Sequence, residues 1–400
     1  DPLIDNKDSK KRYRADTLIE ETAEKWKTEG KQTEADELVS TMNQLLDKED
    51  LKGVYDLIMD AGIKCPESGS DNWTDVRQFN LMFSTQAGSV ADDANEIYLR
   101  PETAQGIFVN FLNVQKSARQ KVPFGIAQIG KAFRNEIVAR QFIFRMREFE
   151  QMEMQFFVRP GTDMEWYEHW KEKRLNWHKA LGIHEDNLKI YDHEKLAHYA
   201  NAAVDIEFKF PFGFKEVEGI HSRTDFDLSS HQKISGKKQQ YFDPEVNQNY
   251  IPYVIETSAG LDRLFLMHLC QAYTEENVVQ GEKEKLRTYL KFHPALAPVK
   301  AAVFPLIKKD GLPEKAKKLY DGLKMDFNII YEENQAIGKR YTRQDLIGTP
   351  VCIAVDHQTL EDDTVTLRHR DTTGQERISI DKVSEKLFSI TNKSGIFNKL

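Results

Sequence analysis

Hydrophobic residues follow two different periods along the chain. From about residue 15 to 60 they recur every three to four positions, as at Leu18, Ala23 and Trp26, with few glycines or prolines between them. This spacing predicts helices that keep one solvated face. Between residues 96 and 158, strand-like and short helical patterns alternate, and the alternation at 149–158 favours antiparallel strands. Residues 65–88 are typical of a loop, with a strand at 79–83.

The middle of the chain continues this mixture of elements. An aromatic-rich amphipathic helix is predicted at 162–182, ending at Gly182, and strands are predicted at 203–210 and 216–220. A further helix is predicted at 261–273, directly after the turn Ser258-Ala259-Gly260.

A proline-rich joint at residues 293–298 separates these elements from a C-terminal region with a different pattern. Strands at 300–305, 328–331, 351–355 and 364–369 alternate with helices at 313–324, 341–347 and 382–387. Such alternation indicates a small α/β domain. We therefore expect an α+β protein with domains at 1–294 and 295–400, and a helical and loop insertion at about 15–75.

Composition narrows the class of protein. The 400 residues are 40% hydrophobic and 30% charged, as in a soluble globular protein. No apolar run of about 18 residues predicts a membrane span, and the first residues are not those of a signal peptide. Three widely spaced cysteines cannot form a disulfide framework, so a reducing cytoplasm is expected. The net charge of −8 favours a metabolic enzyme but does not exclude a local basic groove for nucleic acid.

The strongest chemical signal is Phe133-Arg134-Asn135-Glu136, followed after a loop by a segment that runs from Arg145 to Phe149. Guanidinium groups bind phosphate oxygens through two parallel hydrogen bonds, and an aromatic ring stacks on a purine. Fixed positive charge would also offset the charge that develops on a phosphate during transfer. The segment predicts a nucleoside triphosphate site, although Arg134 and Glu136 taken alone fit a surface ion pair equally well.

These residues resemble motif 2 of the class II aminoacyl-tRNA synthetases, and Ser258-Ala259-Gly260-Leu261-Asp262-Arg263 resembles motif 3. The resemblance implies that Arg134 binds the ATP α-phosphate and the amino-acid carboxylate, and that Arg263 meets the γ-phosphate. It implies that Glu136 contacts adenine and that Phe149 stacks on it. The expected fold is then a class II antiparallel-sheet catalytic core flanked by helices, followed by an α/β anticodon-binding domain.

Longer segments resemble the homodimeric glycyl-tRNA synthetases in particular, over about residues 1–390. They are Arg12–Asp16, Arg77–Phe83, Leu99–Gly106, Arg147–Glu153, Glu218–Leu228 and Ile255–Ser258. Glycine has no side chain, so a pocket must hold its ammonium group and leave no room for a methyl group. Carboxylates at Glu102, Glu153 and Glu256 could surround an ammonium ion with help from Ser258. Because crowded acids repel, we expect one of them to have a raised pKa in the empty pocket.

The resemblance implies a complete set of site residues. The catalytic residues are Arg134 and Arg263. The ATP-binding set is Arg134, Asn135, Glu136, Phe144, Arg145, Met146, Arg147, Glu148, Phe149, Glu216, Val217, Gly260, Leu261, Asp262 and Arg263. The glycine-binding set is Arg14, Glu102, Phe149, Glu150, Gln151, Met152, Glu153, Arg223, Glu256, Thr257, Ser258, Ala259 and Gly260. Expected partners are glycine, ATP with Mg²⁺, tRNA(Gly) and a second copy of the chain, with no metal held by the protein alone. Anticodon contacts are expected from Arg340, Arg343 and Arg368.

Two other functions remain open at this point. The chain could be a class II synthetase for another amino acid, such as proline, threonine or serine. It could also be a synthetase-like tRNA-binding protein that has lost catalysis, which the intact Arg134, Glu136, Phe149 and Arg263 argue against.

The sequence departs from the family pattern in two places. Cys65-Pro66-Glu67-Ser68 has one cysteine where relatives often have a Cys-x-x-Cys pair, so we expect no structural zinc there. No segment matches motif 1, which should precede Asp1, and the chain lacks an initiator methionine. We expect that part of the natural protein precedes this sequence.

Overall fold

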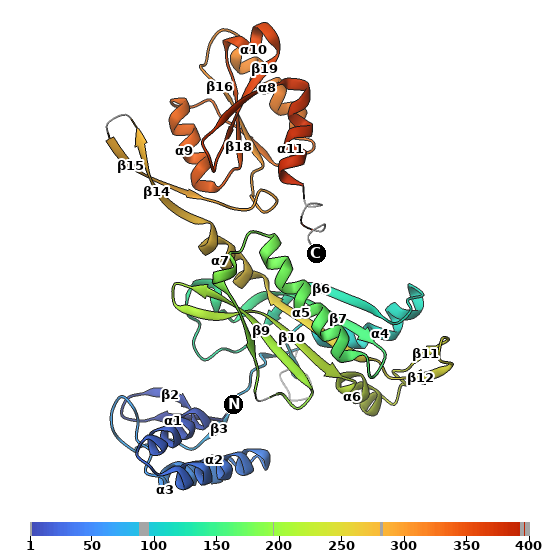
Figure 1. The fold of residues 1–400 in the computed structure, drawn as a ribbon. Coiled ribbons are helices and arrows are strands. Elements are labelled where there is room, and N and C mark those ends of the chain that lie inside the picture. Colours follow the sequence, from blue (N-terminus) through green and yellow to red (C-terminus); the bar gives the residue numbers. More distant parts are fainter. Residues whose placement is uncertain (1, 88–95, 195, 281–282, 393–395, 397–400) are drawn as a thin grey trace. The chain divides into compact units, whose positions relative to one another are not determined.

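The computed structural model describes residues 2–87, 96–194, 196–280, 283–392 and 396 (Figure 1). The chain divides into two compact units. The first comprises Asp1–Pro101 with Phe133–Ile137, and the second comprises Glu102–Ala132 with Val138–Leu400. None of the helices in these described ranges is long and apolar enough to cross a bilayer.

The first unit contains the predicted helices and a small antiparallel sheet of order β2-β1-β3. Leu18 and Ala23 are buried with Ile4 and Trp73 in a common core, which explains the apolar spacing of the helices. The strand expected at 79–83 is wrong, because short strands flank that segment instead. The elements are β1 (Pro2–Asn6), β2 (Lys11–Arg14), α1 (Ala15–Thr28), α2 (Gln32–Asp47), α3 (Leu51–Asp60), β3 (Arg77–Gln78), β4 (Ser84–Gln86) and β5 (Glu96–Tyr98).

The second unit is built on a six-stranded sheet of order β6-β7-β13-β10-β9-β8. From β7 to β8 every neighbouring pair is antiparallel, as the alternating pattern predicts. The strands are β6 (Phe124–Phe133), β7 (Glu148–Val158), β8 (Leu188–Asp192), β9 (Ala202–Phe210), β10 (Gly213–Thr224) and β13 (Tyr253–Gly260). A separate hairpin joins β11 (Tyr241–Asp243) to β12 (Gln248–Tyr250).

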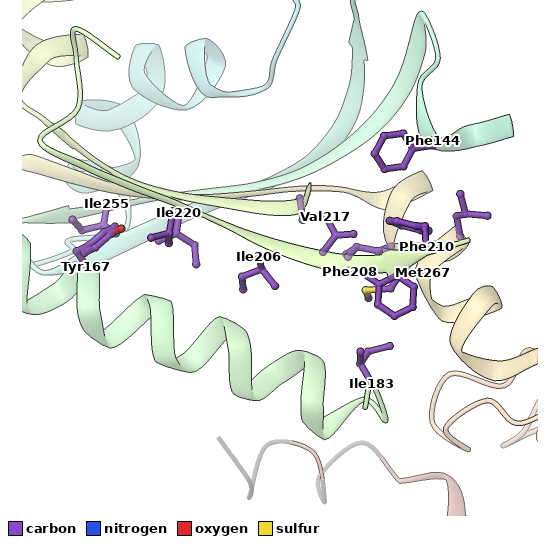
Figure 2. Packing of buried hydrophobic residues seen from close by; sticks show 14 of the residues in the cluster. Phe144, Tyr167, Ile183, Ile206, Phe208, Phe210, Val217, Ile220, Ile255 and Met267 are labelled. Carbon is purple, nitrogen blue, oxygen red and sulfur yellow. The ribbon is translucent and has the colours of Figure 1, made fainter. Parts of the chain in front are cut away.

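Helices cover the two faces of this sheet differently. On one face α5 (Asp163–Ala180) and α7 (Leu261–Ala272) pack on a large apolar cluster that includes Ile206, Ile220 and Ile255 (Figure 2). On the other face α4 (Ala104–Ser117) buries Phe157 and Val254 at one end of the strands, next to α6 (Phe226–Ser235). The rest of that second face carries polar side chains.

Strand β10 serves both faces because successive residues point to opposite sides. Its register shifts between Glu216 and Glu218 where it pairs with β9, which marks a bulge. Beyond the bulge, Glu218 and Ile220 face α5, whereas His221 and Arg223 reach the polar face. Glu218 is 1% exposed and bonds to both Arg174 and His178 of α5.

The C-terminal part of the second unit has a sheet of its own, of order β17-β16-β18-β19-β20. Strands β16, β17 and β18 are parallel, and the remaining pairs are antiparallel. A two-stranded ribbon, which the sequence did not reveal, precedes this sheet, and its Arg287 forms an ion pair with Asp345 of the helix at Ile337–Ile347. The elements are β14 (Tyr273–Gln280), β15 (Lys283–Leu290), β16 (Ala301–Pro305), α8 (Leu312–Leu323), β17 (Ile329–Tyr331), α9 (Ile337–Ile347), β18 (Val351–Val355), α10 (His357–Asp362), β19 (Thr364–His369), β20 (Gln375–Ser379) and α11 (Val383–Thr391).

Candidate active site

Three neighbouring strands place a row of polar side chains on the face of the sheet opposite α5. Every second residue of a strand faces the same side, so Gln151, Glu153 and Gln155 of β7 line up beside Glu256 and Ser258 of β13. Glu256 is paired with Gln155 on one side and with His221 of β10 on the other. These side chains form the polar cluster, which also includes Thr103, His221 and Arg223.

Glu256 is the best-satisfied acid of the polar cluster. His221 Nδ1 lies 2.9 Å from its Oε1, while Arg223 Nη1 at 2.9 Å and Gln155 Nε2 at 2.6 Å donate to its Oε2. Burial alone would raise the pKa of Glu256, but the His221 hydrogen bond and the Arg223 charge outweigh burial and lower that pKa. Glu256 is therefore ionised at neutral pH.

Glu153 has the opposite electrostatic balance. It is 4% exposed, accepts a short hydrogen bond from the Thr103 hydroxyl, and lies 3.3 Å from Gln155 Nε2. Burial and the negative charge of Glu256 raise the pKa of Glu153 to about 8, against the lowering effect of the Thr103 bond. One acid of the predicted trio therefore has a raised pKa, as expected.

Arg223 is held in one orientation by its own partners. Its Nε and Nη2 donate to the two carboxylate oxygens of Asp227 at 2.8 and 3.0 Å. Its guanidinium carbon also lies 4.1 Å from the centre of the Tyr199 ring. A guanidinium fixed by a two-pronged ion pair presents its remaining N–H groups in a defined direction, here to Glu256.

A second group of predicted residues gathers at the start of α7. Arg263 donates to the carbonyl oxygens of Phe144 at 3.1 Å and Glu216 at 3.2 Å, and its guanidinium carbon lies 4.3 Å from the Phe144 ring centre. Asp262 Oδ2 accepts from the backbone N–H of Glu150 at 2.9 Å. The segment that resembles motif 3 is thus tied to the two strands beside it.

Four predicted site residues belong to the first unit. Arg14 lies at the N-terminus of α1 and pairs with Asp16, with its Nε 3.0 Å from Asp16 Oδ1. Arg134 Nε donates to the Pro101 carbonyl at 3.0 Å, and Asn135 Nδ2 donates to the Asn80 carbonyl at 3.3 Å. The backbone N–H of Glu136 donates to the Arg134 carbonyl oxygen at 2.7 Å.

Some predicted side chains face away from the polar cluster. Ala259 and Val217 are buried in the apolar cluster under α5 and α7, and Met152 packs against it. From these positions only the backbone could contact a ligand on the polar face, because strand neighbours point to opposite sides. Their predicted roles remain predictions for the main chain.

The remaining predicted residues lie in and around the same strands. Glu102 precedes α4 and accepts from Gln105 Nε2 at 2.7 Å, and Glu148 forms an ion pair of 3.2 Å with Lys131. Gln151 Nε2 donates to Ser258 Oγ at 2.7 Å. Arg145, Met146, Phe149 and Leu261 are half-buried, Arg147 is exposed, Thr257 is buried, and Gly260 is the N-cap of α7.

Sequence reasoning assigned no site role to Thr103, Gln155, His221 or Asp227. The period of two that places Gln151 and Glu153 on one face also includes Gln155, so the signal for this residue was present. Thr103 and Asp227 lie outside the strands, and only the fold brings them to the polar cluster.

Two of the expected anticodon contacts are wrong. Arg340 is 2% exposed and donates to the backbone carbonyls of Pro305, Leu306 and Glu332. Arg368 is 8% exposed and forms a two-pronged ion pair with Asp345. A base cannot stack on a guanidinium that the protein interior covers, so both residues have structural roles.

The segment with the single cysteine forms a hydrogen-bonded cluster instead of a set of thiolates. Cys65 Sγ lies 3.4 Å from Ser9 Oγ, while Ser9 N–H and Ser68 Oγ both donate to Asn6 Oδ1 at 2.9 Å. Burial raises the pKa of the Cys65 thiol, but hydrogen bonds from Ser68 and other neighbours outweigh burial and lower it to about 6. Within the ranges that the structure describes, no three His, Cys, Asp or Glu residues are arranged to hold a metal ion.

Comparisons with known proteins cover nearly the whole chain. Residues 83–272 match the family model for the tRNA synthetase class II core domain (G, H, P, S and T). Residues 1–34 and 28–81 match glycyl-tRNA synthetase insertion domain 1, and residues 300–389 match an anticodon binding domain.

Full-length relatives agree with these matches. A protein named glycine–tRNA ligase from Chlorobaculum tepidum is 57% identical over 389 residues, which are 97% of this chain and 82% of the relative. Proteins of the same name from Staphylococcus haemolyticus and Ruminiclostridium cellulolyticum are 54% and 52% identical over 96% of this chain, covering 80% and 79% of their own lengths.

Proposed function

This chain belongs to the glycine–tRNA ligases, which are class II tRNA synthetases, and from that premise we propose how its residues attach glycine to tRNA. Two steps are required. An oxygen of the glycine carboxylate attacks the α-phosphorus of ATP, and the bond to pyrophosphate breaks to leave glycyl-adenylate. The terminal ribose hydroxyl of tRNA then attacks the activated carbonyl, which releases AMP.

The first step depends on position and charge, and needs no protein nucleophile. Arg134 would bind the α-phosphate and the glycine carboxylate, and Arg263 would bind the γ-phosphate. The contacts of Arg263 with Phe144 and Glu216 support this role, because they hold the guanidinium in place before ATP arrives. Class II synthetases use a divalent metal, and we propose Mg²⁺ held mainly by the phosphates, which would offset charge at the reacting centre.

The observation that carries the choice of glycine is the polar cluster on β7, β13 and β10. Glu153 and Glu256 are each 4% exposed and could receive an ammonium group, while Gln151 and Ser258 close one side. Charged and polar groups of this kind suit the head of an amino acid and offer no apolar pocket for a side chain. A methyl group would therefore displace packed, hydrogen-bonded atoms.

We further propose that residues 295–400 bind the anticodon, with Arg343 the remaining candidate of the expected contacts. This region has a hydrophobic core of its own, which includes Val303, Ile353 and Leu367. A separate core supports a domain boundary near the joint at 293–298. A homodimer in the cytoplasm, with tRNA(Gly) as the acceptor, completes the proposal.

ATP–pyrophosphate exchange with each of the twenty amino acids tests the assignment. We expect exchange with glycine alone. Exchange with proline, threonine or serine instead would assign the chain to another specificity, and no exchange with any amino acid would favour a tRNA-binding protein without catalysis. Adding tRNA(Gly) should then give glycyl-tRNA and AMP.

A further inference from the structure

The two buried acids of the polar cluster differ in the donors they receive. Glu256 has three partners, His221, Arg223 and Gln155, and Arg223 brings a fixed positive charge. Within the described ranges, the donors to Glu153 are the Thr103 hydroxyl and, at a longer distance, Gln155 Nε2. Among the described residues no lysine, arginine or histidine forms an ion pair with Glu153. A carboxylate this deeply buried without a cation is costly in its charged form.

The cluster also has more acceptors than donors. Gln155 is fully buried and directs its amide N–H groups at the two glutamates, while its Oε1 has no hydrogen-bond partner among the residues that the structure describes. An orphaned buried acceptor is uncommon and calls for a missing donor. An ammonium group brings three N–H donors and no acceptor, so it matches both the charge and the hydrogen-bond deficit of this place.

We propose that Glu153 holds a proton while the site is empty and releases it to solvent when the ammonium group of glycine takes its place. This inference rests on the proposed function. The neutral acid becomes a carboxylate, its O–H bond breaks, the proton goes to the buffer, and glycine enters as the zwitterion. One positive charge replaces another, so the net charge of the buried cluster is the same before and after binding.

The groups around Glu153 keep fixed charges over the relevant pH range, with one exception. Glu256 of β13 is ionised, Arg223 of β10 is cationic with Asp227 of α6 as its partner, and Glu102 adds negative charge from the start of α4. Burial raises the pKa of Tyr199, which keeps this phenol neutral. The exception is His221: burial lowers its pKa, but the Glu256 hydrogen bond and charge outweigh burial and raise it.

Thr103 is the positioning residue of this device. It stands at the N-terminus of α4, where threonine side chains often cap the helix, but it makes no capping bond and gives its hydroxyl to Glu153 instead. Its backbone N–H is taken by Gln151 Oε1 at 3.1 Å, so both polar groups of Thr103 connect the helix to β7. The hydroxyl stabilises the ionised form of Glu153 and sets the pH at which the proton leaves.

Isothermal titration of the full chain with glycine near pH 7 tests the exchange. The binding heats measured in PIPES and in Tris differ by the number of protons released multiplied by the difference between the ionisation enthalpies of the two buffers. We expect about one proton released per glycine in the wild type and none in Glu153→Gln. Equal heats in the two buffers would overturn the inference, and so would undiminished proton release in Glu153→Gln, which would point to His221.

Infrared difference spectra and Thr103 variants keep the inference testable if Glu153→Gln binds glycine too weakly for titration. In the wild type, glycine should remove the carbonyl band of a protonated carboxyl group, and persistence of that band would contradict the exchange. Below the pH at which Glu153 loses its proton, the glycine KM should fall about tenfold for each unit by which the pH rises. Thr103→Val should move that transition to higher pH and Thr103→Ser should restore it, whereas a merely structural role would change stability and leave the transition in place.

Failure of this inference is distinct from failure of the proposed function. If wild-type protein shows no glycine-dependent pyrophosphate exchange, the assignment to glycine is wrong. If exchange proceeds normally but glycine binding releases no proton, the assignment stands and only the role of Glu153 as the proton holder is refuted.

Discussion

Gly219→Ala is a sharp test of how the polar cluster is held in place. Gly219 precedes His221 by two positions on β10, so both residues face the same side of the sheet. A Cβ added at Gly219 would lie 2.9 Å from His221 Cε1, which is about 0.5 Å short of ordinary contact at 3.4 Å. The backbone of Gly219 is not in the left-handed region, so the expected effect comes from this side-chain contact alone.

The magnitude follows from the hydrogen bond that the histidine ring would lose. A displacement of about 0.5 Å stretches the 2.9 Å contact between His221 Nδ1 and Glu256 Oε1 to the limit of hydrogen bonding. A hydrogen bond to a charged group contributes about 1.5–3 kcal/mol, and about 1.4 kcal/mol corresponds to a tenfold change. We therefore expect kcat/KM for glycine to fall about 10- to 100-fold, with a loss of about 1–3 kcal/mol in stability from overpacking.

Steady-state pyrophosphate exchange over a range of glycine concentrations measures this effect, with the KM for ATP as an internal reference. Gly322→Ala is the matched control, because Gly322 lies in α8 and an added Cβ there meets nothing within 4 Å. It should raise stability by about 0.5–1 kcal/mol and leave glycine kinetics unchanged. A folded Gly219→Ala protein with wild-type kcat/KM for glycine would show that His221 does not position Glu256.

Further outcomes are expected for three other variants and for the metal content. Glu218→Gln removes the buried carboxylate that pairs with the half-buried Arg174 and should cost about 3–5 kcal/mol in thermal unfolding with little change in the glycine KM, since Glu218 lies on the α5 face. Arg174 and His178 lower the pKa of Glu218 to about 2 against burial, so its stabilisation is complete above the ordinary glutamate range and is lost as the pH falls toward 2; acid unfolding of the variant should show a weaker dependence on pH there. Asp345→Asn should destabilise the C-terminal region by about 3 kcal/mol in thermal unfolding while glycine-dependent exchange persists. Arg134→Ala should abolish that exchange, and wild-type activity would refute its role; metal analysis of purified protein should find no stoichiometric zinc at Cys65.

Local sequence patterns predicted the elements well wherever one face of an element is buried. The alternation at 149–158 gave β7 within one residue, and the helix expected at 261–273 is α7. The β14–β15 ribbon escaped prediction because its charged stretches, such as Glu275–Glu276, resemble solvated loops. The ribbon is defined by the hydrogen-bonded pairing of its two main chains, and the pattern of side chains does not indicate such pairing.

The sequence predicted the charged residues of the candidate site but not the residues that support them. Glu153 and Glu256 stand out in a sequence, but the pairing of Gln155 with Glu256 depends on strand register, which only the assembled sheet defines. Arg340 and Arg368 show the converse error. Nothing in their local sequence separates an arginine whose donors meet buried carbonyls or Asp345 from one that is free to contact RNA.

Strand β10 contributes side chains to both faces of the sheet, and this also determines how this part of the protein can change over evolutionary time. Substitutions at Glu218 or His221 alter one face and leave the other intact, so each face can drift separately. A one-residue insertion or deletion between them would turn over the residues on one side of it, moving either Glu218 into the polar cluster or His221 into the apolar core. Length changes in β10 should therefore be confined to its two register shifts, at Glu216–Glu218 against β9 and at Ser222–Thr224 against β13.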